Sequence, residues 1–282
     1  MDSQAPIALI TGCNSGIGKH LALEFAARGV SVIATARNVA SIEELTTKHS
    51  NIHALPLELD DLASIDRLRD SVEKLTGGRL DYLVNNAGTH YAATGLDSDV
   101  QEAKKLFDVN LFAVMRLCQL FVPMLRRAIA GRGKIVQIGS IARCVPVVWQ
   151  AVYNASKAAL SQYSKTLRLE LQPFGIEVIE VVTGFVQSNM LRHGFIAPKS
   201  SIYLPLLPII RKFKVEGNNN GMRGEDYARS VVGQVIGRNT AMEIWEGTLA
   251  WKIWTLFSFL PYRLLNLFFY KRFQMDVLKP SP

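Results

Sequence analysis

Short apolar runs alternate with longer amphipathic segments along most of the chain, and this alternation limits the choice of fold more than any other feature. The apolar runs are IALI (7–10), VSVIATA (30–36), IHALPL (52–57), LDYLVNN (80–86), KIVQIGS (134–140) and IEVIEVV (176–182). Strands buried on both faces have such continuous apolar sequences, and helices usually connect parallel strands. The pattern predicts an α/β fold with a doubly wound parallel sheet, whose ligands lie at the carboxyl ends of the strands.

Length and composition predict one main domain, because 282 residues that are 49% hydrophobic can bury a single sizeable core. We place this domain at residues 1–246. The alternation ends after Val182, and residues 187–222 contain three prolines and an NNN run. Long excursions at the ligand end of a sheet are often lids, so a substrate lid is predicted there. Residues 247–282 form a hydrophobic, aromatic C-terminal extension.

The formal net charge of +8 permits a nucleic acid, an anionic membrane or a phosphorylated ligand as partner. Because the basic residues do not form one block, we expect no nucleic acid. Cys13, Cys118 and Cys144 are an odd set without a CxxC pair, which favours idle thiols in a reducing compartment over a disulfide or metal site. The N-terminus carries no recognisable secretory signal, so a cytoplasmic location is expected.

The stretch TGCNSGIGKH (11–20) is a glycine-rich loop between an apolar run and an amphipathic segment. A loop that binds a nucleoside triphosphate needs a glycine at the position of Cys13 and a Ser or Thr at the position of His20. Neither requirement is met, so this interpretation fails. The remaining interpretation is a dinucleotide loop, in which glycines allow the backbone to approach a pyrophosphate at a helix N-terminus. Its glycines are Gly12, Gly16 and Gly18.

Arg37 follows the second apolar run at the place where NAD-binding domains usually carry an acidic residue for the ribose hydroxyl. A guanidinium there can pair with the 2′-phosphate of NADP, and such charge-assisted bonds are strong. We therefore predict a preference for NADPH over NADH. The alternative is that Arg37 is a solvated loop residue.

Ser140 ends the fifth apolar run, and the segment YNASK after it contains Tyr153 and Lys157. Residues four apart meet on one helix face, so the ammonium can stabilise the phenolate and bring the phenol pKa, ordinarily ~10, toward neutrality. We expect Tyr153 to protonate a carbonyl oxygen that Ser140 positions. A surface pair of Tyr and Lys is the alternative, which the preceding serine disfavours.

Together, TGxxxGIG, the YxxxK pair and the preceding serine resemble the short-chain dehydrogenase/reductase family, whose motifs run in the same order from residue 7 to about residue 190. The resemblance implies a Rossmann-type fold, an NADPH/NADP+ cofactor that delivers hydride to the carbonyl carbon, and a homo-oligomer. It also implies that Lys157 holds the nicotinamide ribose. The cofactor residues it implies are Gly12, Ser15, Gly16, Ile17, Gly18, Arg37, Asp60, Asn86, Tyr153, Lys157, Val186 and Ser188.

Further motifs carry some of these roles. Asn86 lies in NNAG (85–88), which resembles the segment that supports the sheet, and Asp60 resembles the residue that bonds adenine. Asn110 in FDVNLF resembles the asparagine that joins the proton relay through water and the helix backbone. Because asparagine is unfavourable inside a helix, its presence favours such a role over that of a solvated side chain.

The segment TGFVQS departs from the family pattern PGxVxT, with Thr183 for proline and Ser188 for threonine. Ser188 keeps a hydroxyl for the nicotinamide carboxamide, and a more flexible turn is expected. This variant, ATARN (34–38) and WEGTLAWKIW resemble a fungal branch that contains NADPH-dependent 1-acyldihydroxyacetone phosphate reductases. That branch also resembles reductases of secondary metabolism, so the substrate stays open.

The C-terminal segment WEGTLAWKIWTLFSFLPYRLLNLFFYKRF is dense in aromatic residues, but Lys252, Pro261 and Arg263 interrupt it. Its longest uninterrupted piece is about half of the ~20 apolar residues that span a bilayer. We predict that residues 250–273 lie at the surface of a membrane or lipid droplet, on the cytosolic face of the endoplasmic reticulum. The alternative is that they pack over the substrate cleft or against a partner subunit.

The leading hypothesis is an NADPH-dependent reductase of a ketone in a hydrophobic substrate, either an acyl-dihydroxyacetone phosphate-like lipid or a polyketide-like secondary metabolite. The second hypothesis is a catalytically silent nucleotide-binding protein with a membrane or assembly role. Basic residues of the expected lid could meet a substrate phosphate or could form a solvated face. They are Arg192, His193, Lys199, Arg211 and Lys212.

Overall fold

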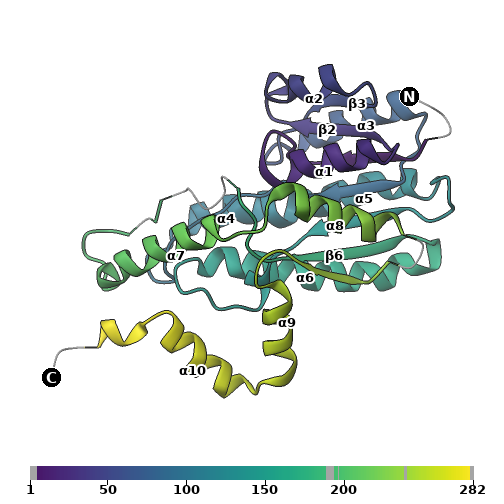
Figure 1. The fold of residues 1–282 in the computed structure, drawn as a ribbon. Coiled ribbons are helices and arrows are strands. Elements are labelled where there is room, and N and C mark those ends of the chain that lie inside the picture. The colour runs from purple at the N-terminus through teal and green to yellow at the C-terminus, as the bar shows by residue number, and fades with distance from the viewer. Residues whose placement is uncertain (1–4, 189–193, 196, 238–239, 280–282) are drawn as a thin grey trace.

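A parallel sheet of seven strands forms the centre of the protein, as the computed structural model shows (Figure 1). The structure describes residues 5–188, 194–195, 197–237 and 240–279. The strands are β1 (Ile7–Ile10), β2 (Ser31–Ala36), β3 (Ile52–Pro56), β4 (Tyr82–Asn85), β5 (Lys134–Ile138), β6 (Glu177–Thr183) and β7 (Glu243–Glu246). Their order is β3-β2-β1-β4-β5-β6-β7, so the direction of strand addition reverses between β1 and β4. The predicted doubly wound sheet is confirmed, and its ligand site belongs at this reversal.

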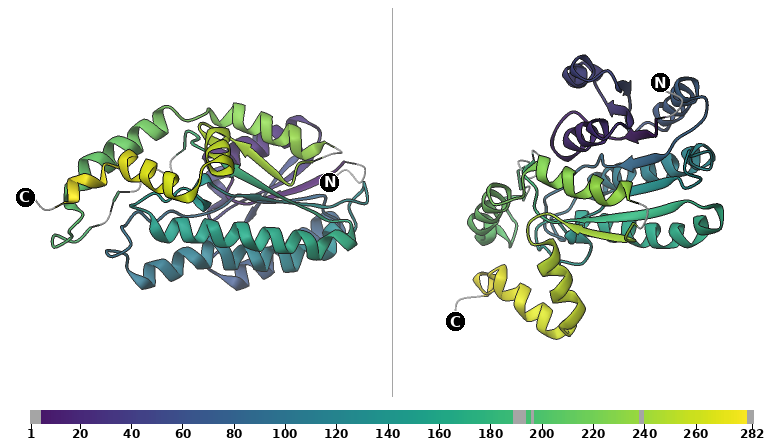
Figure 2. Two further views of the ribbon diagram at one scale, coloured as in Figure 1. Left: turned by 90° about the horizontal axis from the view of Figure 1, so that it is seen from below. Right: turned by 45° about the vertical axis from the view of Figure 1, so that its right-hand side comes forward.

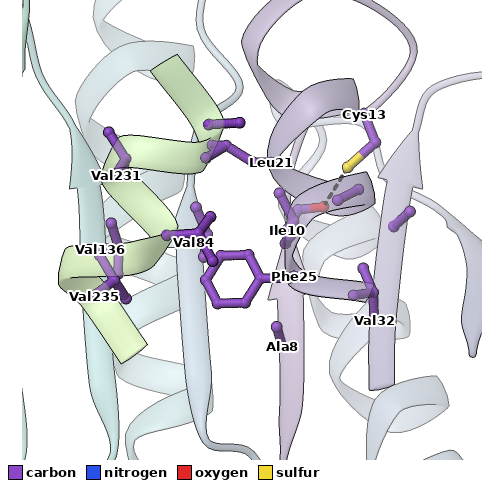
Figure 3. Packing of buried hydrophobic residues seen from close by; sticks show 14 of the residues in the cluster. Ala8, Ile10, Cys13, Leu21, Phe25, Val32, Val84, Val136, Val231 and Val235 are labelled. Carbon is purple, nitrogen blue, oxygen red and sulfur yellow. Dashed lines mark hydrogen bonds between the residues drawn. The ribbon is translucent and has the colours of Figure 1, made fainter. Parts of the chain in front are cut away.

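Helices cover both faces of the sheet (Figure 2). One face carries α1 (Gly16–Ala27), α2 (Glu43–Lys48) and α8 (Gly224–Ile236), and the other carries α3 (Leu62–Thr76), α5 (Ala113–Leu125) and α6 (Ala151–Leu171). Figure 3 shows Phe25 of α1 with Val231 and Val235 of α8 against Val84 and Val136 of the sheet. Each face of the sheet thus has its own apolar core, which explains why the strands are apolar on both sides.

The seventh strand was absent from the predicted set. Strand β7 has the sequence EIWE and pairs with β6 at the edge of the sheet. Glu243 forms an ion pair with Arg143, and Glu246 accepts a hydrogen bond from Ser230. Because these contacts satisfy both carboxylates, a short edge strand can contain two glutamates. The sequence of β7 is therefore not an apolar run like those of the other strands.

A long helical stretch runs from Val100 to Leu125 in three parts, α4 (Val100–Phe107), the π-helical turn η2 (Asp108–Phe112) and α5. Among the described residues this is the one helix long and apolar enough to cross a membrane. Its α5 part contacts α3, and residues Leu117 and Phe121 are buried in the core under the sheet. The stretch is therefore a core helix of the fold.

The expected lid region contains more regular structure than its prolines suggested. Helix α7 (Leu207–Asn219) begins with Pro208 in its first turn, where the missing N–H costs no hydrogen bond. The C-terminal segment forms α9 (Ala250–Phe259) and α10 (Tyr262–Arg272), which extend away from the sheet layers (Figures 1 and 2). The predicted lid residues Arg192 and His193 lie outside the described residues.

Candidate active site

A cavity of about 840 Å³ lies at the carboxyl ends of the strands, next to the reversal between β1 and β4. Almost every residue that the sequence placed in the site lines it. These are Gly12, Ser15, Gly16, Ile17, Gly18, Arg37, Asp60, Asn86, Ser140, Tyr153, Lys157, Val186 and Ser188. The exception is Asn110, which lies behind the wall. The sequence thus located one site, formed by the segments that follow six of the strands.

The glycine loop is shaped for close approach by a ligand. Gly12 and Gly16 have φ angles of +72° and +55°, and a Cβ at Gly18 would lie 2.1 Å from the carbonyl oxygen of Gly12. The first turn of α1 holds no acidic residue, and the side chain of its N-cap Ser15 makes no capping bond. The N–H groups at this helix end are therefore available, and the loop fits the pyrophosphate of a dinucleotide.

Asn86 fastens the glycine loop to β4. Its side-chain amide donates to the carbonyl oxygens of Thr11 (2.8 Å) and Gly12 (3.2 Å). The backbone N–H groups of Asn86 and Ala87 donate to the Thr11 hydroxyl at 3.0 and 2.9 Å. Asn86 therefore holds the loop in shape, which agrees with the supporting role predicted for NNAG.

Arg37 and Asp60 lie at the far end of the cavity, after β2 and β3. Both are exposed, and among the described residues no carboxylate forms an ion pair with Arg37. The Arg37 guanidinium is thus available for an anionic group on a ligand that extends from the glycine loop. Asp60 occupies the same end, where the adenine of a dinucleotide is expected.

Ser140, Tyr153 and Lys157 come together at the opposite end of the cavity. Ser140 caps the turn after β5, where its hydroxyl accepts from the N–H of Ala142 at 3.1 Å. Tyr153 and Lys157 lie on the first turns of α6, with the Lys157 Nζ 5.9 Å from the centre of the tyrosine ring. Lys157 also donates to the carbonyl oxygen of Ile138 at 3.0 Å. A hydroxyl, a phenol and an ammonium therefore face one space.

In the protein without a cofactor, burial sets the pKa values of Tyr153 and Lys157. It raises the pKa of Tyr153 to about 12, against the opposing effect of a hydrogen bond with Ser140. It lowers the pKa of Lys157 to about 8, opposed by the carboxylate of Glu180. In the protein alone the pKa of Tyr153 thus moves away from neutrality, because loss of hydration dominates, and the effect of Lys157 on the phenol with cofactor bound stays a prediction.

Asn110 lies in the π-helical turn η2 and is buried. Its Oδ1 accepts from the N–H of Thr89 at 2.8 Å, and its Nδ2 donates to the Thr89 carbonyl oxygen (3.0 Å) and the Ser156 hydroxyl (3.2 Å). The side chain thus ties the segment after β4 to α6, one residue from Lys157. Single π-helical turns often occur at functional sites. The proposed relay through the Asn110 backbone stays a prediction.

The turn after β6 is more firmly held than its departure from the family pattern suggested. The Thr183 hydroxyl lies 2.6 Å from the hydroxyl of Tyr227, and both side chains are buried. Phe185 exchanges backbone hydrogen bonds with Thr248, and the N–H of Ser188 donates to the side chain of Asn218. The expected flexibility is therefore not what the structure shows, because α7 and the segment after β7 pair with the turn.

His90 is a site residue that sequence reasoning missed. Asn154 donates to the carbonyl oxygen of Val147, and its Oδ1 accepts from the amide of Gln150, whose Oε1 lies 3.0 Å from His90 Nε2. A backbone carbonyl only accepts, so this chain of bonds puts a proton on His90 Nε2. The His90 ring lies 4.8 Å from the ring of Tyr153. No local motif marks His90, because Gln150 lies 60 residues away in sequence.

Aromatic side chains form part of the cavity wall. Trp149, Phe185 and Phe213 belong to this wall, and Phe213 contacts both of the others at centroid distances of 4.9 and 5.7 Å. Lys214 of α7 also lines the cavity. The basic residues predicted to meet a substrate phosphate do not line it where they are described. These are Lys199, Arg211 and Lys212.

The cysteines show no features of reactive thiols. Cys13 and Cys118 are buried, and burial raises their pKa to about 12. Burial also raises the pKa of Cys144 to about 11. Within the described ranges no group of three or more His, Cys, Asp or Glu residues could hold a metal ion.

Comparison with known proteins gives similarity over nearly the whole chain. The pattern of the short chain dehydrogenases matches residues 6–196. The chain is 40% identical over 276 residues to Short-chain dehydrogenase RED1 of Pyricularia oryzae, covering 96% of this chain and 95% of that protein. It is 37% identical to the NADPH-dependent 1-acyldihydroxyacetone phosphate reductase of Schizosaccharomyces pombe, covering 87% and 84%. A solved short-chain dehydrogenase from Streptomyces avermitilis has a TM-score of 0.81 at 26% identity, covering 98% and 99%.

Proposed function

The chain belongs to the short-chain dehydrogenase family, and from this premise we propose that it is an NADPH-dependent reductase of a ketone in a hydrophobic substrate. One observation carries the proposal. Ser140, Tyr153 and Lys157 meet in the same cavity as a glycine loop that fits a pyrophosphate. A hydroxyl to position an oxygen and a phenol to protonate it are the groups that carbonyl reduction requires.

The raised pKa of Tyr153 suits reduction, because the phenol keeps its proton at neutral pH. When bound, NADPH supplies the hydride. Tyr153 donates its proton to the carbonyl oxygen, which becomes a stronger base than phenolate as it acquires alkoxide character, so the transfer is favourable. Ser140 holds this oxygen by a hydrogen bond, and Lys157 holds the ribose and adds positive charge beside the phenol.

Two observations support NADPH over NADH. The first is that the chain has Ala36 and Arg37 at the end of β2, where an acidic residue would repel the 2′-phosphate of NADPH. The second is that the Arg37 guanidinium has no carboxylate partner in the described part of the chain. The name of the relative from Schizosaccharomyces pombe also gives that protein as NADPH-dependent.

The cavity wall supports a hydrophobic substrate. Trp149, Phe185 and Phe213 give the cavity an apolar wall, and Lys214 adds one basic side chain. An acyl-dihydroxyacetone phosphate-like lipid fits both features, and an apolar secondary-metabolite ketone fits the aromatic wall alone. The names of the relatives include both a reductase of that lipid class and short-chain dehydrogenases without a named substrate.

NADPH oxidation with a panel of apolar ketones, followed by absorbance, tests the proposal. We expect turnover by the natural protein and a loss of about 10²- to 10⁴-fold in Tyr153→Phe, because general acid catalysis contributes this much. Tyr82→Phe is the matched control, since Tyr82 begins β4 at the opposite end from the cavity and its loss should leave turnover unchanged.

Two results would count against the proposal. Full turnover in Tyr153→Phe would exclude this phenol as the acid. Tight NADPH binding without turnover of any ketone would favour the second hypothesis, a catalytically silent nucleotide-binding protein.

A further inference from the structure

Helix α10 carries apolar side chains on two opposite faces. Leu265, Phe269 and Phe273 are 2–5% exposed and pack against the rest of the protein. On the other side, Leu264, Leu267 and Phe268 are 48–56% exposed. A helix that is apolar on both sides is normally covered on both sides. The outward side of α10 therefore lacks a partner within this chain.

Helix α9 also carries exposed aromatic side chains. Its residues Trp251 and Phe259, together with Tyr262 after it, are 64–76% exposed. Trp and Tyr combine an apolar ring with a polar atom, and they concentrate where a membrane meets water. We call these side chains and those on the outward side of α10 the outer face. Its members are Trp251, Phe259, Tyr262, Leu264, Leu267 and Phe268.

The charges of the segment that carries the outer face are almost all positive. Residues 247–282 contain the basic residues Lys252, Arg263, Lys271, Arg272 and Lys279, and Asp276 is their one acidic residue. Asp276 is already paired with Lys271 and Lys279 at 2.7 Å each. Lys252 and Arg263 are exposed and have no carboxylate partner in the described ranges. Two copies of this face would repel each other, whereas an anionic surface would attract it.

From these observations we propose that the outer face docks the protein on a membrane surface that contains anionic lipid. Helices α9 and α10 have 10 and 11 residues, so each is about 15 to 17 Å long at ~1.5 Å per residue. A bilayer core is ~30 Å thick, so neither helix spans it. Both instead lie in the interface, with aromatic side chains in the lipid and basic side chains at the headgroups.

Docking in this way places lipid close to the substrate cavity. Phe273, on the inner side at the end of α10, lies 5.2 Å from the ring of Trp149 and 5.8 Å from that of Phe213, centre to centre. Both of these rings line the cavity. Helix α10 with its inner side chains is therefore all that separates the membrane from the wall that receives an apolar substrate.

Vesicle sedimentation of the full chain, without cofactor or substrate, tests the proposal independently of the reductase activity. The vesicles contain phosphatidylcholine alone or with 30% phosphatidylserine. We expect the natural protein to sediment with the anionic vesicles and to be released in part by 0.5 M salt, which screens charge. The triple variant Trp251→Gln/Phe259→Gln/Phe268→Gln should bind at least 10-fold more weakly. The variant Lys252→Glu/Arg263→Glu should lose the preference for phosphatidylserine.

The matched control is Leu62→Gln/Leu96→Gln/Leu169→Gln, which removes three apolar side chains of 58–77% exposure from other surfaces. It should bind vesicles like the natural protein. Natural protein that stays in the supernatant with both vesicles would overturn the proposal. So would equal loss of binding in the control, or a dimer in sedimentation velocity that the triple variant converts to monomer while no vesicle binds.

Discussion

At the scale of single residues, the loss of water decides how the catalytic groups are charged. Tyr153 and Lys157 are both less than 10% exposed, and burial moves their pKa values in opposite directions, to about 12 and about 8. Each shift moves the equilibrium toward the neutral form, since a buried charge loses its hydration. At neutral pH the phenol is fully protonated, while the ammonium is near its titration point.

This arrangement predicts how reduction depends on pH. Tyr153 keeps its proton well above neutrality, so the first group to change is Lys157, which loses its charge as pH rises through about 8. We expect kcat/KM for ketone reduction to fall above about pH 8, measured between pH 6 and 10. In Lys157→Arg the fall should move to higher pH, because guanidinium stays charged. Lys165→Arg, on the exposed side of the same helix, should keep the original profile, and a flat profile in the natural protein would contradict the prediction.

Arg37 gives a second prediction at this scale. In Arg37→Asp the ratio of catalytic efficiency with NADPH to that with NADH should fall by about 10- to 100-fold. A hydrogen bond to a charged group contributes ~1.5–3 kcal/mol, and the new carboxylate also repels the 2′-phosphate. Arg132→Asp makes the same charge change at the far end of the sheet and should leave the ratio as it is. An unchanged ratio in Arg37→Asp would remove this residue from cofactor selection.

At the scale of elements, the sequence predicted what local spacing determines. Six strands, the glycine loop and the positions of Ser140, Tyr153 and Lys157 follow from apolar runs and fixed intervals. The elements it missed depend on distant contacts. Strand β7 is stabilised by partners for its two glutamates, and α7 tolerates Pro208 in its first turn. His90 is held in the site by Gln150, which is 60 residues away, and no periodic pattern in the sequence indicates such a pair.

The glycine loop gives a prediction at the scale of elements, through Gly18. In Gly18→Ala the new Cβ would meet the Gly12 carbonyl, a backbone atom that cannot move without opening the loop. We expect NADPH affinity, measured by calorimetry, to fall at least about 10-fold. Gly29→Ala is the control, since Gly29 ends α1 with a φ of +78° and open space around it. It should cost about 1 kcal/mol of stability and leave NADPH affinity unchanged. Equal affinities in both variants would contradict the role given to Gly18.

At the scale of the whole molecule, a buried ion cluster joins the turn after Ser140 to the last strands. Arg143 forms ion pairs with Glu180 of β6 and with Glu243 of β7, the latter at 2.7 Å, and lies over the ring of Trp245. Ser161 of α6 also donates to Glu180, at 2.8 Å. The cluster thus connects the catalytic loop, the sheet edge and α6.

Removing Arg143 should therefore destabilise the protein in a pH-dependent way. Arg143→Met leaves the fully buried Glu180 without its cation, which should cost about 3–5 kcal/mol of unfolding free energy at pH 7. Burial already raises the pKa of Glu180, and the loss of Arg143 raises it further. The folded variant then binds more protons than the unfolded chain, so its stability should increase as pH falls from 7 to 5. Urea denaturation at both pH values measures this.

The double variant Arg143→Met/Glu180→Gln is the control for that prediction, because it removes the uncompensated charge. It should recover much of the lost stability at pH 7. A loss in Arg143→Met that is the same at pH 5 and pH 7 would show that the charge of Glu180 is not the cause.

The contact of Phe273 with Trp149 and Phe213 makes the end of the chain a structural part of the pocket. Chain ends usually tolerate tags and truncation, because little depends on them. Here a fusion or cut near Phe273 would reshape the space that receives substrate, without touching Ser140, Tyr153 or Lys157. Residues 250–279 therefore help to shape the pocket, and replacing them with the segment of a relative should change selectivity while Ser140, Tyr153 and Lys157 stay in place.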